Sequence, residues 1–135
     1  MIMGHKTIYP TPEMIIRYNE VVLRNIVVKK ADKSEVLSYG AIEKVIFECK
    51  TNDGDIYDKA VCLLKGLVKR HPFVSGNRRT AFVAVNEFIK SNRGRFNVIN
   101  SPEYARVMQG IRENYYSDME IKEWIKNGEI RAFKR

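Results

Sequence analysis

The residues with the clearest chemical potential lie in one short segment, residues 71–81, which reads HPFVSGNRRTA. The imidazole of His71 is a side chain that can accept a proton near neutral pH. Gly76 lets a ligand approach the backbone closely, and Arg78 and Arg79 follow two positions later. Guanidinium groups bind phosphates through paired hydrogen bonds. A proton acceptor beside a phosphate-binding group predicts transfer from a phosphate-containing donor to a hydroxyl that His71 deprotonates.

The position of the two arginines strengthens this interpretation. The apolar pattern after Asn77 predicts a helix that begins near Arg78. The first turn of a helix carries partial positive charge and unpaired N–H groups, so cations there are unfavourable unless an anion binds. We therefore predict a phosphate site made of Arg78, Arg79 and the backbone N–H groups that follow Gly76. A purely structural role is the competing reading for His71.

Positive charge is concentrated around this segment. The chain has 24 Lys and Arg residues against 16 Asp and Glu residues, which gives a formal net charge of +8. Between residues 65 and 95, eight basic residues stand against the single acid Glu87, so this stretch carries +7. Such asymmetry indicates an anionic partner, for example a nucleotide, a nucleic acid or an acidic protein segment. A merely solvated basic face is the alternative.

Helical patterns must position this segment, because they occupy most of the 135 residues. Capping residues and apolar spacing predict helices from Pro12 to about Asn25, from Glu35 or Tyr39 to Cys49, from the Asp55–Asp58 caps to His71, from Arg78 to Ser91, from Pro102, and from Ser117 to Asn127. The helix that begins at Arg78 is apolar almost all round, which is typical of a buried helix. We therefore predict a compact all-α bundle and one domain spanning residues 1–135.

Several other classes of protein and site are disfavoured. Cys49 and Cys62 belong to no CxxC motif or Cys/His cluster, so both are expected to be reduced core residues. No apolar run approaches the roughly 20 residues that span a bilayer, and no signal peptide is recognisable. We expect a soluble, non-exported, cytoplasmic protein without membrane contact. Zinc-finger and RNP signatures are absent, so specific nucleic-acid binding is not expected. Four residues at helical spacing are expected in the core: Met14, Met108, Met119 and Trp124.

The segment from His71 to Phe82, HPFVSGNRRTAF, closely resembles the motif of the Fic/Doc (Fido) family. In that motif a His is followed by Phe, an acidic residue, a small residue, Asn, Gly or Lys, and Arg. The residues in register are His71, Phe73, Gly76, Asn77, Arg79, Thr80 and Ala81. The resemblance implies a helical bundle around a buried central helix, with at most a short β-hairpin flap. The flap that positions the target is placed loosely at Glu48–Gly54.

The resemblance also implies roles for individual residues. His71 is implied to be the general base for a protein hydroxyl, Asn77 to hold the donor phosphates and Arg79 to pair with a phosphate. The backbone after Gly76 is implied to form the anion hole, and Arg78 adds a further positive charge. Together these residues imply ATP as the donor.

The implied metal is Mg²⁺, and its site departs from the family pattern. Ser75 occupies the position of the acidic residue that helps to hold the ion. Mg²⁺ prefers charged oxygen ligands, so the serine weakens this site and leaves the metal ligands unknown. Two interpretations of this departure remain open. The protein is either an active enzyme with a weakened metal site or a catalytically weak homologue.

Two further positions are similar to the Doc, or death-on-curing, branch. Phe82 stands where AMP-transferring Fic enzymes carry a second arginine, and Arg78 keeps the positive charge of the lysine in Doc. The resemblance thus implies a toxin-type protein kinase that transfers a phosphoryl group to a Ser or Thr of a translation component. The resemblance implies an elongation factor as that component and a small antitoxin as a further partner. Two alternatives remain, an AMP transferase and a Fido-fold binding module that Ser75 has left catalytically weak.

Overall fold

The computed structural model describes residues 6–25 and 34–134. The helices in these ranges are α1 (Pro12–Arg24), α2 (Tyr39–Thr51), α3 (Ile56–Arg70), α4 (Asn77–Ser91), α5 (Pro102–Arg112) and α6 (Asp118–Asn127). No strand forms in the two described ranges, where β pairing is limited to one isolated antiparallel bridge between Val36 and Phe73. The predicted all-α class is confirmed.

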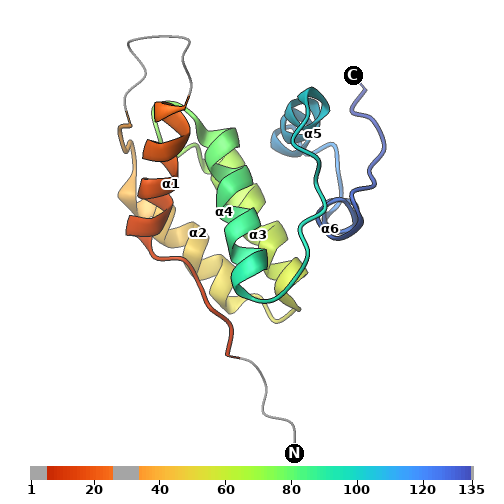
Figure 1. The fold of residues 1–135 in the computed structure, drawn as a ribbon, viewed down its shortest axis with the longest axis horizontal. Coiled ribbons are helices and arrows are strands. Elements are labelled where there is room, and N and C mark those ends of the chain that lie inside the picture. The colour runs from red at the N-terminus through yellow and green to blue at the C-terminus, as the bar shows by residue number, and fades with distance from the viewer. Residues whose placement is uncertain (1–5, 26–33, 135) are drawn as a thin grey trace, which may run out of the picture.

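Two helices form the centre of the bundle. α3 and α4 pack against each other in the middle of the molecule, with α1 and α2 on one side and α5 and α6 on the other (Figure 1). α1 contacts α4, α2 contacts α3, and both α5 and α6 contact α3. The loop between α3 and α4, which carries the His71 segment, therefore joins the two central helices.

The burial of α4 follows the pattern predicted for it. From Thr80 to Ile89 the only exposed residue is Glu87, and Ala81, Val85 and Phe88 belong to the core. A helix that is covered on nearly every side is held in place by its neighbours. Its first turn is correspondingly fixed relative to the loop before it.

Local caps set the ends of the helices as expected. The Thr11 hydroxyl accepts a hydrogen bond from the Met14 N–H at 3.2 Å, at the start of α1. Asp55 with Asp58, and Ser117 with Glu120, form capping boxes at the starts of α3 and α6. These side chains satisfy backbone N–H groups that a helix end leaves unpaired.

The predicted flap position is wrong. Residues 48–51 form the last turn of α2, and residues 52–54 are a turn that leads to the N-cap of α3. The Asn52 N–H donates to the Glu48 carbonyl at 3.2 Å, and the Thr51 hydroxyl donates to the Phe47 carbonyl at 2.9 Å. These bonds extend the helix past the expected end at Cys49, so no room for a hairpin remains.

Two of the four expected core residues lie on the surface. Met108 and Trp124 are buried, as predicted, but Met14 and Met119 are 38% and 74% exposed. The buried face of α6 is made by Ile121, Trp124 and Ile125. Met119 lies two positions before Ile121, which places it on nearly the opposite side of the helix.

Two segments outside the helices are irregular and form no strand. Residues 96–99 run as an irregular segment beside α6, held by a 3.0 Å hydrogen bond from the Asn97 N–H to the Ile125 carbonyl. Of the N-terminal piece, residues 6–10 are irregular and residues 1–5 lie outside the described residues.

Both cysteines are free thiols, but they differ in their surroundings. Cys49 is fully buried, whereas Cys62 is only half-buried and its Sγ accepts a hydrogen bond from the Asn52 amide at 3.3 Å. The expectation of two core cysteines is therefore correct for Cys49 alone. Burial raises the pKa of the Cys49 thiol to about 12.

We expect Cys49 of the folded protein to resist iodoacetamide at pH 8 and to react fully in guanidinium chloride, because alkylation requires an accessible thiolate. The reference pKa of 9.0 applies once the chain unfolds. The unfolded state therefore loses this proton at a lower pH than the folded state, and the stability contributed by Cys49 should fall as the pH rises above 9.0. Mass spectrometry of labelled peptides measures the first effect, with Cys62 as the internal comparison. Equal labelling rates for the two thiols in the native protein would contradict the expectation.

Candidate active site

His71 marks the exit from α3. It is the C-cap of that helix, with a left-handed φ of 50°, and its side chain is exposed. Pro72 disfavours helical geometry in the residue before it, which ends the helix at this point as predicted. The backbone turn directs the chain away from α3 and into the loop that precedes α4.

Asn77 fixes the shape of this loop. Its buried side chain accepts a hydrogen bond from the Phe73 N–H at 3.0 Å and donates one to the Phe73 carbonyl at 2.9 Å. Phe73 is itself fully buried and anchors the loop in the core. The structure thus gives Asn77 a positioning contact, and its contact with donor phosphates stays a prediction.

Asn19 is a site-supporting residue that sequence reasoning missed. This fully buried side chain of α1 donates hydrogen bonds to the Ser75 carbonyl at 2.9 Å and to the Thr80 hydroxyl at 3.0 Å. Its own carbonyl accepts a hydrogen bond from the Ser34 hydroxyl at 2.7 Å. The sequence feature that could have indicated this role is an amide on the apolar face of α1, at helical spacing from Ile15.

We expect Asn19→Ala to lower the free energy of unfolding by about 1–2 kcal/mol, because it leaves buried partners without their hydrogen bonds. The matched control is Glu20→Ala at the exposed neighbouring position, which should change stability by less than about 0.5 kcal/mol. Urea denaturation of both variants measures the difference. Equal midpoints would show that Asn19 does not hold the loop.

Gly76 is required by its backbone conformation and by its neighbours. It is the N-cap of α4 with a left-handed φ of 78°. A Cβ at this position would lie 3.1 Å from Leu23 Cδ2 and 3.2 Å from Asn19 Nδ2. No side chain caps α4, so the N–H groups of its first turn are left for a ligand.

The structure brings all the predicted site residues to one cleft of about 370 Å³. Its lining residues come from α3, the loop, α4 and α5, and they are Val68, His71, Val74, Ser75, Gly76, Asn77, Arg78, Arg79 and Arg112. Arg112, in the last turn of α5, was not predicted. Its role could not be predicted from the sequence, because it lies 33 positions after Arg79. Only the packing of α5 brings it to the cleft.

Among the described residues, the lining of this cleft is positive and includes no Asp or Glu. Arg78 and Arg79 form no ion pair with any described residue. The cations just before the loop are engaged elsewhere: Arg70 pairs with Glu48 at 3.0 Å, and the Lys69 ammonium donates to the Asn114 side chain. The positive charge at the cleft therefore comes from arginines that remain available to an anion.

Arg78 and Arg79 also line an adjoining cleft of about 440 Å³. Its other lining residues are Asn100, Ser101, Pro102, Tyr104 and Ala105, which lie at the start of α5. The two arginines therefore stand between two hollows, and a ligand longer than one phosphate has space on both sides of them.

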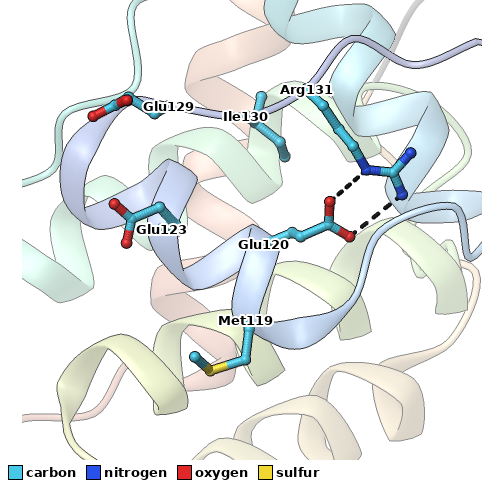
Figure 2. Close-up of a pocket in the computed structure, with 6 residues that line it drawn as sticks. All are labelled: Met119, Glu120, Glu123, Glu129, Ile130 and Arg131. Carbon is cyan, nitrogen blue, oxygen red and sulfur yellow. Dashed lines mark hydrogen bonds and ion pairs between the residues drawn. The ribbon is translucent and has the colours of Figure 1, made fainter.

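A third cleft, of about 560 Å³, has the opposite electrostatic character. Figure 2 shows it on α6 and the segment that follows, lined by Met119, Glu120, Glu123, Glu129, Ile130 and Arg131. The Arg131 guanidinium pairs with Glu120 and holds the pKa of that carboxyl low, at about 2. Since its three glutamates outnumber this arginine, the cleft is unsuited to a phosphate.

The segment before α2 lies against the His71 loop. The Leu37 N–H donates to the Pro72 carbonyl at 2.8 Å, and the Val74 N–H donates to the Glu35 carbonyl at 3.0 Å. Leu37 and Val74 are exposed beside the cleft. A segment that pairs with the backbone of the His71 loop therefore exists, but it precedes α2. The flap was predicted at the other end of this helix, at Glu48–Gly54.

The chain matches one known family over the helices that surround the His71 loop. The sequence model of the Fic/DOC family matches residues 6–89, which include α1, α2, α3, the His71 loop and most of α4. The chain belongs to the Fic/DOC family. A comparison with curated proteins found no match. The Fic/DOC match ends before α5, so Arg112 lies outside it.

Two further properties concern residues 6–25 and 34–134. None of their helices combines the length and the apolar character needed to cross a membrane. They also contain no group of three or more His, Cys, Asp or Glu side chains arranged to hold a metal ion.

Proposed function

We propose that this Fic/DOC protein transfers a phosphoryl group from ATP to a Ser or Thr hydroxyl of a protein, with His71 as the general base. The observation that carries the proposal is the shared cleft: one hollow is lined by a base, by two arginines that form no ion pair with a described residue, and by uncapped helix N–H groups. Family membership supports nucleotide-dependent transfer in general terms.

The proposed reaction divides the work among these groups. His71 takes the proton of the hydroxyl as its oxygen bonds to the γ-phosphorus, and the bond between that phosphorus and the bridging oxygen breaks. ADP leaves with the electron pair. Arg79, Arg78 and the first-turn N–H groups of α4 hold the negative charge of the phosphates, which is the main contribution of protein groups to phosphoryl transfer.

The cleft fits the polyphosphate of ATP better than it fits Mg²⁺. A hard divalent cation requires oxygen ligands, and the described lining residues supply the Ser75 hydroxyl but no carboxylate. Three guanidinium groups would also repel a cation held by the protein. We therefore derive no step of the reaction through a metal, although Mg²⁺ supplies charge neutralisation when it accompanies ATP.

Phosphoryl transfer is preferred over AMP transfer because of Phe82 and Arg78. The Phe82 ring packs against Tyr104 and Phe96, with ring centroids 4.8 Å and 5.2 Å apart. This position therefore contributes to packing instead of binding a phosphate. The proposed target, a translation component such as an elongation factor, and the proposed small antitoxin rest on the resemblance to the Doc branch. The proposed cytoplasmic location rests on the sequence pattern alone.

The decisive experiment is label transfer to a cell extract with α-labelled and γ-labelled ATP in parallel. We expect protein-bound label from the γ position alone, and its loss in His71→Asn. Label from the α position would instead establish AMP transfer.

A binding module is the second candidate, and Ser75 is the observation that favours it. No label from either position, together with recovery of label in Ser75→Asp, would indicate a Fic/DOC fold whose metal site has decayed. A module of this kind should bind an acidic partner in a salt-sensitive way, and His71→Asn should leave that binding unchanged.

A further inference from the structure

We propose that Arg112 of α5 binds the polyphosphate of the donor, and that it joins Arg78 and Arg79 in supplying the charge that a divalent cation otherwise provides. The inference rests on the proposed function, since it concerns the same cleft. It predicts that a nucleoside triphosphate binds without Mg²⁺.

The first support is the position of Arg112. It lines the cleft that contains His71 and Ser75, although it comes from a helix beyond the Fic/DOC match. Three guanidinium groups thus line one hollow, to which the described residues contribute no carboxylate. Like charges in a shared hollow repel one another, so the arrangement is favourable only when an anion occupies it.

The second support is that contacts with α3 and α4 fix the position of α5. Near its start, Tyr104 packs on Phe82 of α4, and just beyond its end the Asn114 side chain accepts a hydrogen bond from Lys69 of α3. Both ends of α5 are therefore tied to the central helices that frame the cleft. Phe82, which replaces the second arginine of AMP-transferring relatives, thus helps to place a helix that brings its own arginine.

The third support is that Arg112 has no competing role among the described residues. It forms no ion pair there, and no side-chain hydrogen bond. A cation in the last turn of a helix also gains from the helix dipole, and an exposed lysine or arginine anywhere in that turn would serve this purpose. The dipole alone therefore does not explain an arginine that faces the cleft.

The chemistry of the ligand follows from this arrangement. A triphosphate carries several negative charges along its length, and each arginine offers a fork of donors that matches phosphate oxygens. The Ser75 hydroxyl cannot supply the missing carboxylate charge for a metal. A third guanidinium lowers the need for that metal, because it neutralises the phosphates directly.

The test is equilibrium binding of ATP, AMP, adenosine and inorganic tripolyphosphate to the full chain, in EDTA and again in Mg²⁺. The variants are Arg112→Ala, Arg112→Lys and the matched control Arg95→Ala. Arg95 is exposed and follows the opposite end of α4 from the cleft. Thermal unfolding of each variant shows whether the fold is retained.

We expect the wild type to bind ATP in EDTA, and Mg²⁺ to change its dissociation constant by less than about threefold. Arg112→Ala should weaken the binding of ATP and tripolyphosphate about tenfold, as expected for the loss of a charge-assisted contact. It should leave AMP and adenosine nearly unchanged, because these ligands lack the distal phosphates. Arg112→Lys should recover part of the loss, and Arg95→Ala should match the wild type.

Either of two results would overturn the inference: unchanged ATP binding in Arg112→Ala, or loss of wild-type binding in EDTA. If label transfer still depends on His71 in these cases, the proposed function stands without this role for Arg112. If Arg112→Ala weakens binding but no label is transferred, the binding role stands and the proposed function fails. A wild type that binds none of the phosphate ligands in either condition would refute both.

Discussion

Replacing His71 with Asn should lower the rate of phosphoryl transfer by about 10²–10⁴-fold, the range expected for loss of a general base. Among the described residues of the cleft, His71 is the one suited to accept the proton of the target hydroxyl, since none of them is a carboxylate. Asn is the appropriate substitute because His71 adopts a left-handed conformation, with a φ of 50°, which Asn tolerates better than Ala. The measurement is the initial rate of γ-label incorporation.

The same variant should leave both ATP affinity and stability close to those of the wild type. His71 is exposed, so its replacement removes no core packing and should change the free energy of unfolding by less than about 0.5 kcal/mol. The difference in the free energy of unfolding between His71→Ala and His71→Asn measures what the left-handed backbone conformation costs. A His71→Asn protein that transfers label at the wild-type rate would exclude His71 as the base.

Replacing Asn77 with Ala should reduce the free energy of unfolding by about 2–4 kcal/mol, because two buried backbone groups lose their partners at once. Those groups are the N–H and the carbonyl of Phe73, which are 3.0 Å and 2.9 Å from the Asn77 amide atoms. Transfer should fall as well, since the loop carries His71. Guanidinium denaturation measures the stability change.

Two further variants test whether the loss of stability comes from the hydrogen bonds to Phe73 or from the removal of an amide side chain as such. Asn127→Ala removes an exposed amide whose bond is to Glu123 on the same helix, and it should be nearly neutral. Asn77→Asp retains an acceptor for the Phe73 N–H but directs a carboxylate at the Phe73 carbonyl, so it should remain destabilised. Stability of Asn77→Ala equal to that of Asn127→Ala would contradict the role described for this loop contact.

The features that could be predicted from the sequence are those with local causes. Thr11 before Pro12, and Ser117 before Glu120, mark helix starts because the cap and its partners are neighbours in the chain. The burial of α4 follows from its own apolar composition. The motif residues converge on one cleft largely because they are consecutive.

The features that could not be predicted depend on contacts between distant parts of the chain. Asn19 reaches a carbonyl in the His71 loop, and Arg112 reaches the cleft through the packing of α5. The bridge between Val36 and Phe73 also joins distant parts of the chain, and for this reason the sequence predicted the segment beside the loop on the wrong side of α2. Periodicity identifies the apolar face of a helix but does not identify which neighbour covers it.

The hydrogen bond from Asn19 to Ser75 spans 56 positions of sequence, and this separation bears on the order of events in folding. Closing so long a loop costs conformational entropy, so such contacts form after the local helices. During synthesis α1 leaves the ribosome well before its partner loop does, and the cleft cannot be completed until α4 has also emerged. A polypeptide released before Thr80 therefore lacks a finished site, and any activity belongs to chains whose synthesis has passed that point.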